Sequence, residues 1–205
     1  MTRTTHILNL LDRRARSFLT DPKGLAAVEL AMILPLMLML MSLVVFSGQA
    51  YTVQRKVTLA ATTVANIFAQ ANNNNASTIT AAELNQILAY PNLILYPYNG
   101  STAAVEVSQL LVTVQNGTAT GTVQVSCANA NGTPRPVGQQ ISVDSSIASA
   151  FATSSNNYVV LGEVQYPFQP TGLYFSVGAT TLHDSIIMIP RVASPITVQS
   201  TPSCN

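Results

Sequence analysis

Residues 23–35 read KGLAAVELAMILP, and this stretch decides how the chain is organised. The apolar run that begins here continues to Phe46, and Glu29 is the only formal charge within it and before Arg55. A helix over residues 25–46 would be about 33 Å long at ~1.5 Å per residue. That length crosses a hydrocarbon core of ~30 Å, so the sequence predicts a transmembrane helix here.

Charge is scarce in this chain and unevenly placed. Charged residues make up 8% of the sequence, whereas a soluble domain usually carries about 25%. The basic residues that precede the apolar run are Arg3, Arg13, Arg14, Arg16 and Lys23. A basic flank on the amino side predicts a cytoplasmic amino terminus and an exported remainder. Because this flank adjoins an apolar span, we expect contact with membrane lipid and no nucleic-acid partner.

The helix is predicted to continue past the apolar run to residue 70. No proline occurs between Gly48 and Ala71, and small apolar residues recur with helical spacing. They are Val53, Val57, Ala60, Val64 and Ile67. A stripe of this period covers one helix face, so the second half of the helix is expected to protrude from the lipid. The chain therefore divides into a leader (1–24), a long helix (25–70) and a remainder (71–205).

The remainder reads as a mostly β domain with short helices. Thr80 and Glu83 have capping-box spacing, which predicts a helix from Ala81 to about Tyr90, ended by Pro91. A second short helix is expected at about residues 145–153. Asn-Gly pairs, which favour tight turns, occur at 99–100, 116–117 and 131–132. Alternating apolar residues predict strands, with a bulge near residues 108–109 and a last strand ending at Pro190. The fold class is therefore α+β: a long N-terminal transmembrane helix followed by a domain with short helices and an antiparallel sheet.

The two cysteines, Cys127 and Cys204, both lie in the predicted exported part. An even number of cysteines in an oxidising compartment favours a disulfide, although two free thiols remain the alternative. Cys127 shares a strand face with Val123 and Val125, so it is predicted to point into the core. Two cysteines without clustered histidines do not make a zinc site, and we expect no metal and no other cofactor.

No catalytic residues are predicted. His183, Asp184 and Ser185 are the residue types of a hydrolase triad, but neighbours on a strand point to opposite faces and cannot form the relay. The carboxylates that could form a glycosidase pair are Glu83, Glu106, Asp144 and Glu163. Each is better interpreted as a solvated or helix-capping residue. We therefore expect that the protein is not an enzyme.

The opening stretch resembles a type IV prepilin cleavage site. In that pattern a basic leader ends in Gly, the cut follows, and an apolar helix carries Glu at the fifth mature position; here these residues are Gly24, Leu25 and Glu29. The longer segment GLAAVELAMILPLMLMLMSLVVFSGQAYTVQRKVTLAATTVA also resembles the TadE-like pseudopilins of tight-adherence (Flp) pilus systems. The shared features are Ala-Val-Glu, the Leu-Pro that follows, the apolar run and the Ala-rich helix.

This resemblance implies a structural role as a minor pseudopilin. A prepilin peptidase would cut between Gly24 and Leu25, leaving an amine one helix turn from Glu29, where the carboxylate could neutralise it or a neighbour's amine. The mature protein would lie in the bacterial inner membrane as a single-pass protein with its β domain in the periplasm. Its partners would be the peptidase, other pilins and pseudopilins, and the pilus assembly machinery.

Two other interpretations remain open. Gly48, Gln49 and Ala50 form a signal-peptidase-like site, which would release a secreted domain beginning at Tyr51. Alternatively, the chain is a signal-anchored periplasmic enzyme or ligand-binding domain. Loss of an activity in His183→Ala would favour that second alternative.

Overall fold

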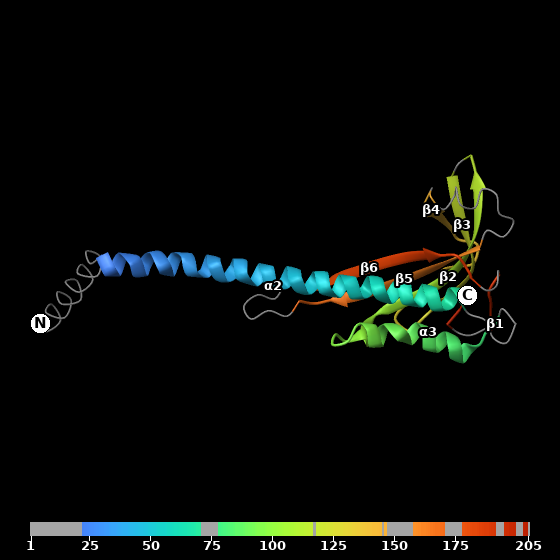
Figure 1. Cartoon of the computed structure of the whole chain (residues 1–205), viewed down its shortest axis with the longest axis horizontal. Coiled ribbons are helices and arrows are strands. Elements are labelled where there is room, and N and C mark those ends of the chain that lie inside the picture. Colours follow the sequence, from blue (N-terminus) through green and yellow to red (C-terminus); the bar gives the residue numbers. More distant parts are fainter. Residues whose placement is uncertain are drawn as a thin grey trace, which may run out of the picture. The chain divides into compact units, whose positions relative to one another are not determined.

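The structure is a computed structural model, and the chain divides into two compact units. One unit comprises residues 1–48 and 171–175, and the other comprises residues 49–170 and 176–205 (Figure 1). The structure describes residues 22–70, 78–116, 118–144, 146, 158–170, 178–191, 195–199 and 203–204. The predicted α+β class is confirmed.

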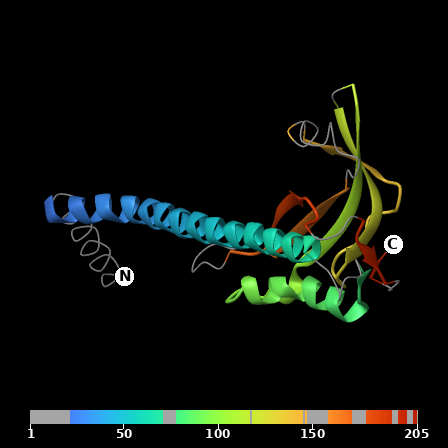
Figure 2. The same ribbon diagram turned by 45° about the vertical axis from the view of Figure 1, so that its right-hand side comes forward.

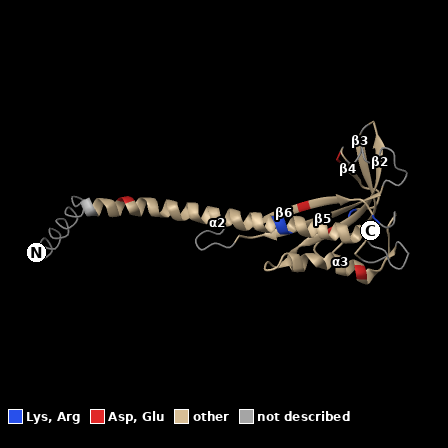
Figure 3. Ribbon diagram, in the orientation of Figure 1, with Lys and Arg blue, Asp and Glu red and all other residues tan. Residues whose placement is uncertain are grey.

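The long helix α2 spans Pro22–Ala69, close to the predicted 25–70, and includes Pro35. Pro22 is well suited to this start because the first turn of a helix does not need its backbone N–H. Large apolar side chains between Leu25 and Val45 are exposed, and Figure 3 shows how few charges this part carries. Within the described residues, α2 is the one helix long and apolar enough to cross a membrane. This finding is consistent with single-pass membrane anchoring.

The part of α2 in the second unit packs on a sheet. Its fully buried side chains are Val53, Val57, Ala60, Ala61, Val64, Ala65, Phe68 and Ala69. The predicted stripe is therefore correct except at its end, where Ile67 is only half-buried and Phe68 enters the core instead. Gly162 in the sheet allows this close packing, since a Cβ there would lie 2.8 Å from the Ala65 Cβ.

The main sheet has five strands in the order β4-β3-β2-β5-β6, and all neighbours are antiparallel (Figures 1 and 2). The strands are β2 (Ala104–Gln115), β3 (Thr118–Ala128), β4 (Gln140–Val143), β5 (Tyr158–Phe168) and β6 (Thr180–Met188). A separate pair joins β1 (Thr78–Ile79) to β7 (Thr197–Val198) in parallel. The last main strand therefore ends at Met188, close to the predicted end at Pro190.

The strand face beneath α2 forms the larger hydrophobic core. Val105 and Val107 of β2 and Val160 and Val164 of β5 contribute to it. A second cluster lies around Leu110, Val112, Val123, Val143, Val159 and Leu161. Because Val159 and Leu161 of β5 belong to the second cluster while Val160 and Val164 belong to the first, the two clusters occupy opposite faces of the sheet.

The Asn-Gly pairs do not all form hairpins. Asn116, with φ of 51°, lies in the turn that joins β2 and β3, as predicted. Asn99 instead caps the 3₁₀ helix η1 (Gly100–Thr102), and residues 131–132 lie in a turn of the longer β3–β4 connection. The predicted bulge is confirmed as a register shift after Gln109, where Gln124 of β3 is left without a partner in β2.

Helix α3 spans Ala81–Ile94 and begins with the predicted capping box. The Thr80 hydroxyl accepts from the Glu83 N–H at 3.3 Å, and the Glu83 carboxylate accepts from the Thr80 N–H at 2.9 Å. The predicted end at Tyr90 is wrong, because the helix continues through Pro91. Proline removes only one helical hydrogen bond here. Pro91 and the C-cap residue Leu95 are both buried, and this burial holds the last turn in place. The helix predicted at 145–153 lies outside the described residues except for Ser146.

Candidate functional site

The residues of the predicted processing site lie near the beginning of α2. Gly24, Leu25 and Glu29 are all helical, and the side chains of Leu25 and Glu29 are exposed. Glu29 follows Leu25 by about one helix turn. The leader residues 1–21 lie outside the described part of the chain.

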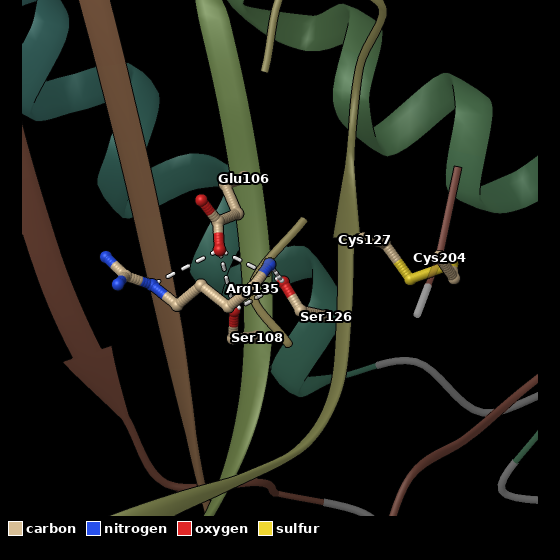
Figure 4. Close-up of a disulfide and its surroundings, with 6 residues drawn as sticks. All are labelled: Glu106, Ser108, Ser126, Cys127, Arg135 and Cys204. Atoms are coloured by element: carbon tan, nitrogen blue, oxygen red, sulfur yellow. Dashed lines mark hydrogen bonds and ion pairs between the residues drawn. A yellow bond between two sulfur atoms is a disulfide. The ribbon is translucent and has the colours of Figure 1, made fainter. Parts of the chain in front are cut away.

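The structure joins Cys127 and Cys204 in a disulfide, with an Sγ–Sγ distance of 2.02 Å (Figure 4). Cys127 is fully buried in β3, which agrees with its predicted inward orientation. Next to the bridge, the Ala128 N–H donates to the Ser203 carbonyl at 2.8 Å. The disulfide therefore attaches the segment around residues 203–204 to β3 across a sequence separation of 77 residues.

A polar cluster on the sheet face away from α2 is centred on Arg135. Glu106 of β2 and Glu163 of β5 lie directly opposite each other in register. The Arg135 guanidinium binds both Glu163 carboxylate oxygens, at 2.6 to 2.9 Å, and its Nε lies 3.2 Å from Glu106 Oε1. Such a bidentate arrangement is a strong form of ion pair. The prediction that Glu106 and Glu163 are solvated is therefore wrong: Glu163 is only 8% exposed.

Two buried serines complete this cluster. Ser126 Oγ donates to Glu106 at 3.0 Å and accepts from the Arg135 backbone N–H at 2.9 Å, and Ser108 Oγ lies 2.9 Å from Ser126 Oγ (Figure 4). Burial raises the pKa of Glu106, and the nearby charge of Glu163 acts in the same direction. The Ser126 hydrogen bond and the Arg135 charge oppose this rise only in part.

Hydrogen bonds of the Asn129 side-chain amide fix the backbone of the connection that carries Arg135. Asn129 Oδ1 accepts from the backbone N–H groups of Val105, Asn131 and Gly132, and its Nδ2 donates to the Ala103 carbonyl at 2.8 Å. These hydrogen bonds attach the start of the β3–β4 connection to the start of β2. Arg135 lies further along the same connection, between two prolines that restrict the backbone.

The geometry favours a stabilising role for the cluster. Both carboxylates are bound by Arg135, which removes the free acid and free nucleophile that a glycosidase pair requires. A small cavity of about 200 Å³ borders Glu106 and Glu163 and is lined mainly by polar groups. No group of three His, Cys, Asp or Glu side chains able to hold a metal occurs among the residues that the structure describes.

The residues of the triad-like stretch diverge as the strand alternation predicts. His183 Nε2 lies 3.6 Å from Glu163, on the face of the polar cluster. Asp184 instead accepts a hydrogen bond from Thr58 of α2. The remaining carboxylates behave as predicted: Glu83 caps α3, and Asp144 accepts from the Ser146 N–H at 2.8 Å.

Comparison with known families adds one match. Residues 24–66 match the family model described as TadE-like protein, so the chain is consistent with a TadE-like protein. The matched segment contains Gly24, Leu25 and Glu29 and ends within α2. No curated protein and no solved structure matches the chain.

Proposed function

From the premise that its amino-terminal helix is TadE-like, we propose that this protein is a minor pseudopilin of a tight-adherence pilus system. The observation that carries the proposal is the family match over residues 24–66, which coincides with Gly24, Leu25 and Glu29 at the beginning of an apolar helix. The role is structural rather than catalytic, in agreement with the arginine-bound carboxylates of the polar cluster.

The protein lies in the inner membrane with its amino terminus in the cytoplasm and residues beyond the span in the periplasm. The basic leader supports this orientation. Prepilin peptidase removes residues 1–24, and the mature chain interacts with other pilins and with the assembly machinery.

The first experiment is to determine the mass and the first residue of the mature protein. We expect Leu25, and we expect Gly24→Leu to retain the leader because a bulky side chain replaces the small residue at the cut. A mature chain that begins at Met1 would contradict processing. One that begins at Tyr51 would indicate signal peptidase and a secreted protein instead.

A second experiment tests the assembly role of Glu29. A carboxylate in lipid costs ~2.5 kcal/mol or more, so Glu29→Ala should insert into the membrane at least as well as wild type. It cannot neutralise an amino terminus, so crosslinking to pilin subunits should fall, and Glu29→Gln should behave like the alanine variant. Unchanged crosslinking and normal pili in both variants would show that Glu29 has no assembly role.

A further inference from the structure

Four segments of the second unit meet around a cavity of about 390 Å³. They are α3, the 3₁₀ helix η1, the start of the β3–β4 connection and the carboxyl-terminal segment at Ser203. Small-molecule sites in proteins usually measure ~300–1,000 Å³. The cavity therefore has room for a small ligand.

The polar side chains of this cavity are amides and hydroxyls, and none of the described residues that line it is charged. An amide offers one acceptor oxygen and two donor hydrogens, and a hydroxyl both donates and accepts. Such a lining pairs with a ligand that is itself rich in hydroxyls. A phosphate, carboxylate or ammonium group would lose water here without gaining a counter-charge. The side chains concerned are Asn85, Asn92, Asn129, Asn131, Ser101 and Ser203.

One wall of the cavity is held in a fixed geometry. Asn131 Nδ2 donates to the Ser101 carbonyl at 2.6 Å and to the Ala103 carbonyl at 3.1 Å. These bonds use both donor hydrogens of the amide, so its Oδ1 is the atom left to accept from a ligand. Asn129 is held through its own amide by Val105, Asn131, Gly132 and Ala103. Groups that are already fixed lose little side-chain entropy when a ligand binds.

A second wall is one face of α3. Asn85 and Asn92 are seven residues apart, so they lie two turns apart on the same helix face. Both are exposed, and neither side-chain amide has a hydrogen-bond partner among the residues that the structure describes. Between them, Leu88 and Ala89 add apolar surface to the cavity. A sugar ring has the same division, because its C–H groups form apolar faces and its hydroxyls surround the rim.

We propose that this cavity, which we call the amide pocket, binds a neutral mono- or disaccharide. Sugar hydroxyls donate to Asn131 Oδ1 and exchange hydrogen bonds with the free amides of Asn85 and Asn92, while a C–H face packs on the apolar surface of α3. The bond from Cys204 to β3 keeps Ser203 at the edge of the pocket. The inference goes beyond the pilus role and does not depend on membrane anchoring, because every lining residue belongs to the second unit.

Saturation-transfer-difference NMR of the full chain in phosphatidylcholine nanodiscs tests the proposal. The probes are maltose, cellobiose, lactose and N,N′-diacetylchitobiose, and nanodiscs are used because maltoside detergents would compete with them. We expect saturation transfer to at least one of these sugars above the level measured with empty nanodiscs. Glucose 6-phosphate and glucosamine are charged controls and should show none.

Substitutions on α3 locate the binding site. Asn85→Ala and Asn92→Ala each remove one free amide from an exposed helix position, so each should raise the dissociation constant of the bound sugar about two- to tenfold without unfolding the protein. Gln86→Ala is the matched control, because Gln86 is an exposed amide on the same helix that does not line the pocket. It should leave the affinity unchanged. Ala89→Trp should fill the pocket and abolish binding.

Three results would each overturn the inference. The first is the absence of saturation transfer to all of the uncharged sugars. The second is an unchanged affinity in both Asn85→Ala and Asn92→Ala, since the sugar would then bind elsewhere. The third is equal transfer to the charged controls, because an uncharged amide lining would then not be selecting the ligand.

Discussion

Arg135 joins two carboxylates that face each other across neighbouring strands. Without it, Glu106 and Glu163 would be two like charges in register on a largely buried surface. Directly opposed like charges destabilise a sheet. The cluster holds two acids and one arginine, so it keeps a net negative charge, and Glu106 is the member whose pKa burial raises.

This raised pKa predicts a pH dependence of stability with a definite sign. A carboxylate with a higher pKa in the folded state binds more protons when folded. The contribution of Glu106 to the free energy of unfolding should therefore increase as the pH falls through its raised pKa, and the increase should be complete below the ordinary Glu pKa. The measurement is urea unfolding of the full chain in detergent over a pH series. We expect the free energy of unfolding of wild type to increase, relative to that of Glu106→Gln, as the pH falls through this range.

Glu83 provides a control with the opposite sign. Its pKa is lowered, first by the hydrogen bond from the Thr80 backbone and then by the Thr80 side chain. Its stabilising contribution is present above the ordinary Glu pKa and should be lost as the pH falls through the lowered pKa. If Glu106→Gln and Glu83→Gln showed the same pH trend relative to wild type, the assigned origin of the Glu106 shift would be wrong.

At the scale of elements, the contact between α2 and β5 decides how closely the helix approaches the sheet. Small residues occupy both sides of this contact, with Ala61 and Ala65 on the helix and Gly162 on the strand. A Cβ at Gly162 would lie 2.8 Å from the Ala65 Cβ and 3.0 Å from the Ala61 carbonyl oxygen. Backbone atoms on the helix cannot yield as a flexible side chain can.

Gly162→Ala should therefore destabilise the second unit by about 1–3 kcal/mol, the usual cost of overpacking a core. Gly178→Ala is the matched control, because a Cβ there meets nothing within 4 Å, and it should change stability by less than ~1 kcal/mol. Urea midpoints of both variants measure the effect. Equal midpoints would show that α2 can move away from β5 without cost.

The elements could be predicted where one local pattern dominated. The apolar run, the stripe from Val53 to Val64 and the Thr80–Glu83 box each predicted the correct helix face or boundary. The end of α3 could not be predicted, because tertiary burial of Leu95 offsets the local effect of Pro91.

The polar cluster was missed for a related reason. Arg135 meets Glu163 across a sequence separation of 28 residues, and only the Pro-Arg-Pro stretch gives a local sign of a fixed backbone.

At the scale of the whole molecule, the disulfide closes a covalent loop between residues 77 positions apart in the sequence. It attaches the segment around residues 203–204 to β3, beside the larger hydrophobic core. Much of the stabilisation by the disulfide is expected to arise because the bridge lowers the conformational entropy of the unfolded chain. The bridge should therefore contribute to stability in addition to the packing of Cys204 against the larger hydrophobic core.

Reduction should lower the free energy of unfolding by about 4 kcal/mol in the chain-entropy model. The measurement is urea unfolding with and without dithiothreitol, and Cys127→Ala/Cys204→Ala serves as the control that should not respond to the reductant. Mass analysis after alkylation without reductant should show both thiols blocked. Two alkylated cysteines in the folded wild type would refute the bridge.

The outer strand β6 has a consequence for how copies of the protein can associate. An edge strand normally offers free backbone groups to which another chain can add a strand. Here Gln54 of α2 donates to the His183 carbonyl in the middle of β6, at 3.2 Å, and Thr58 holds the next residue, Asp184. The opposite edge, β4, is only four residues long. A chain that added a strand along β6 would first have to break the Gln54 hydrogen bond to the His183 carbonyl and displace α2, which lies against this strand.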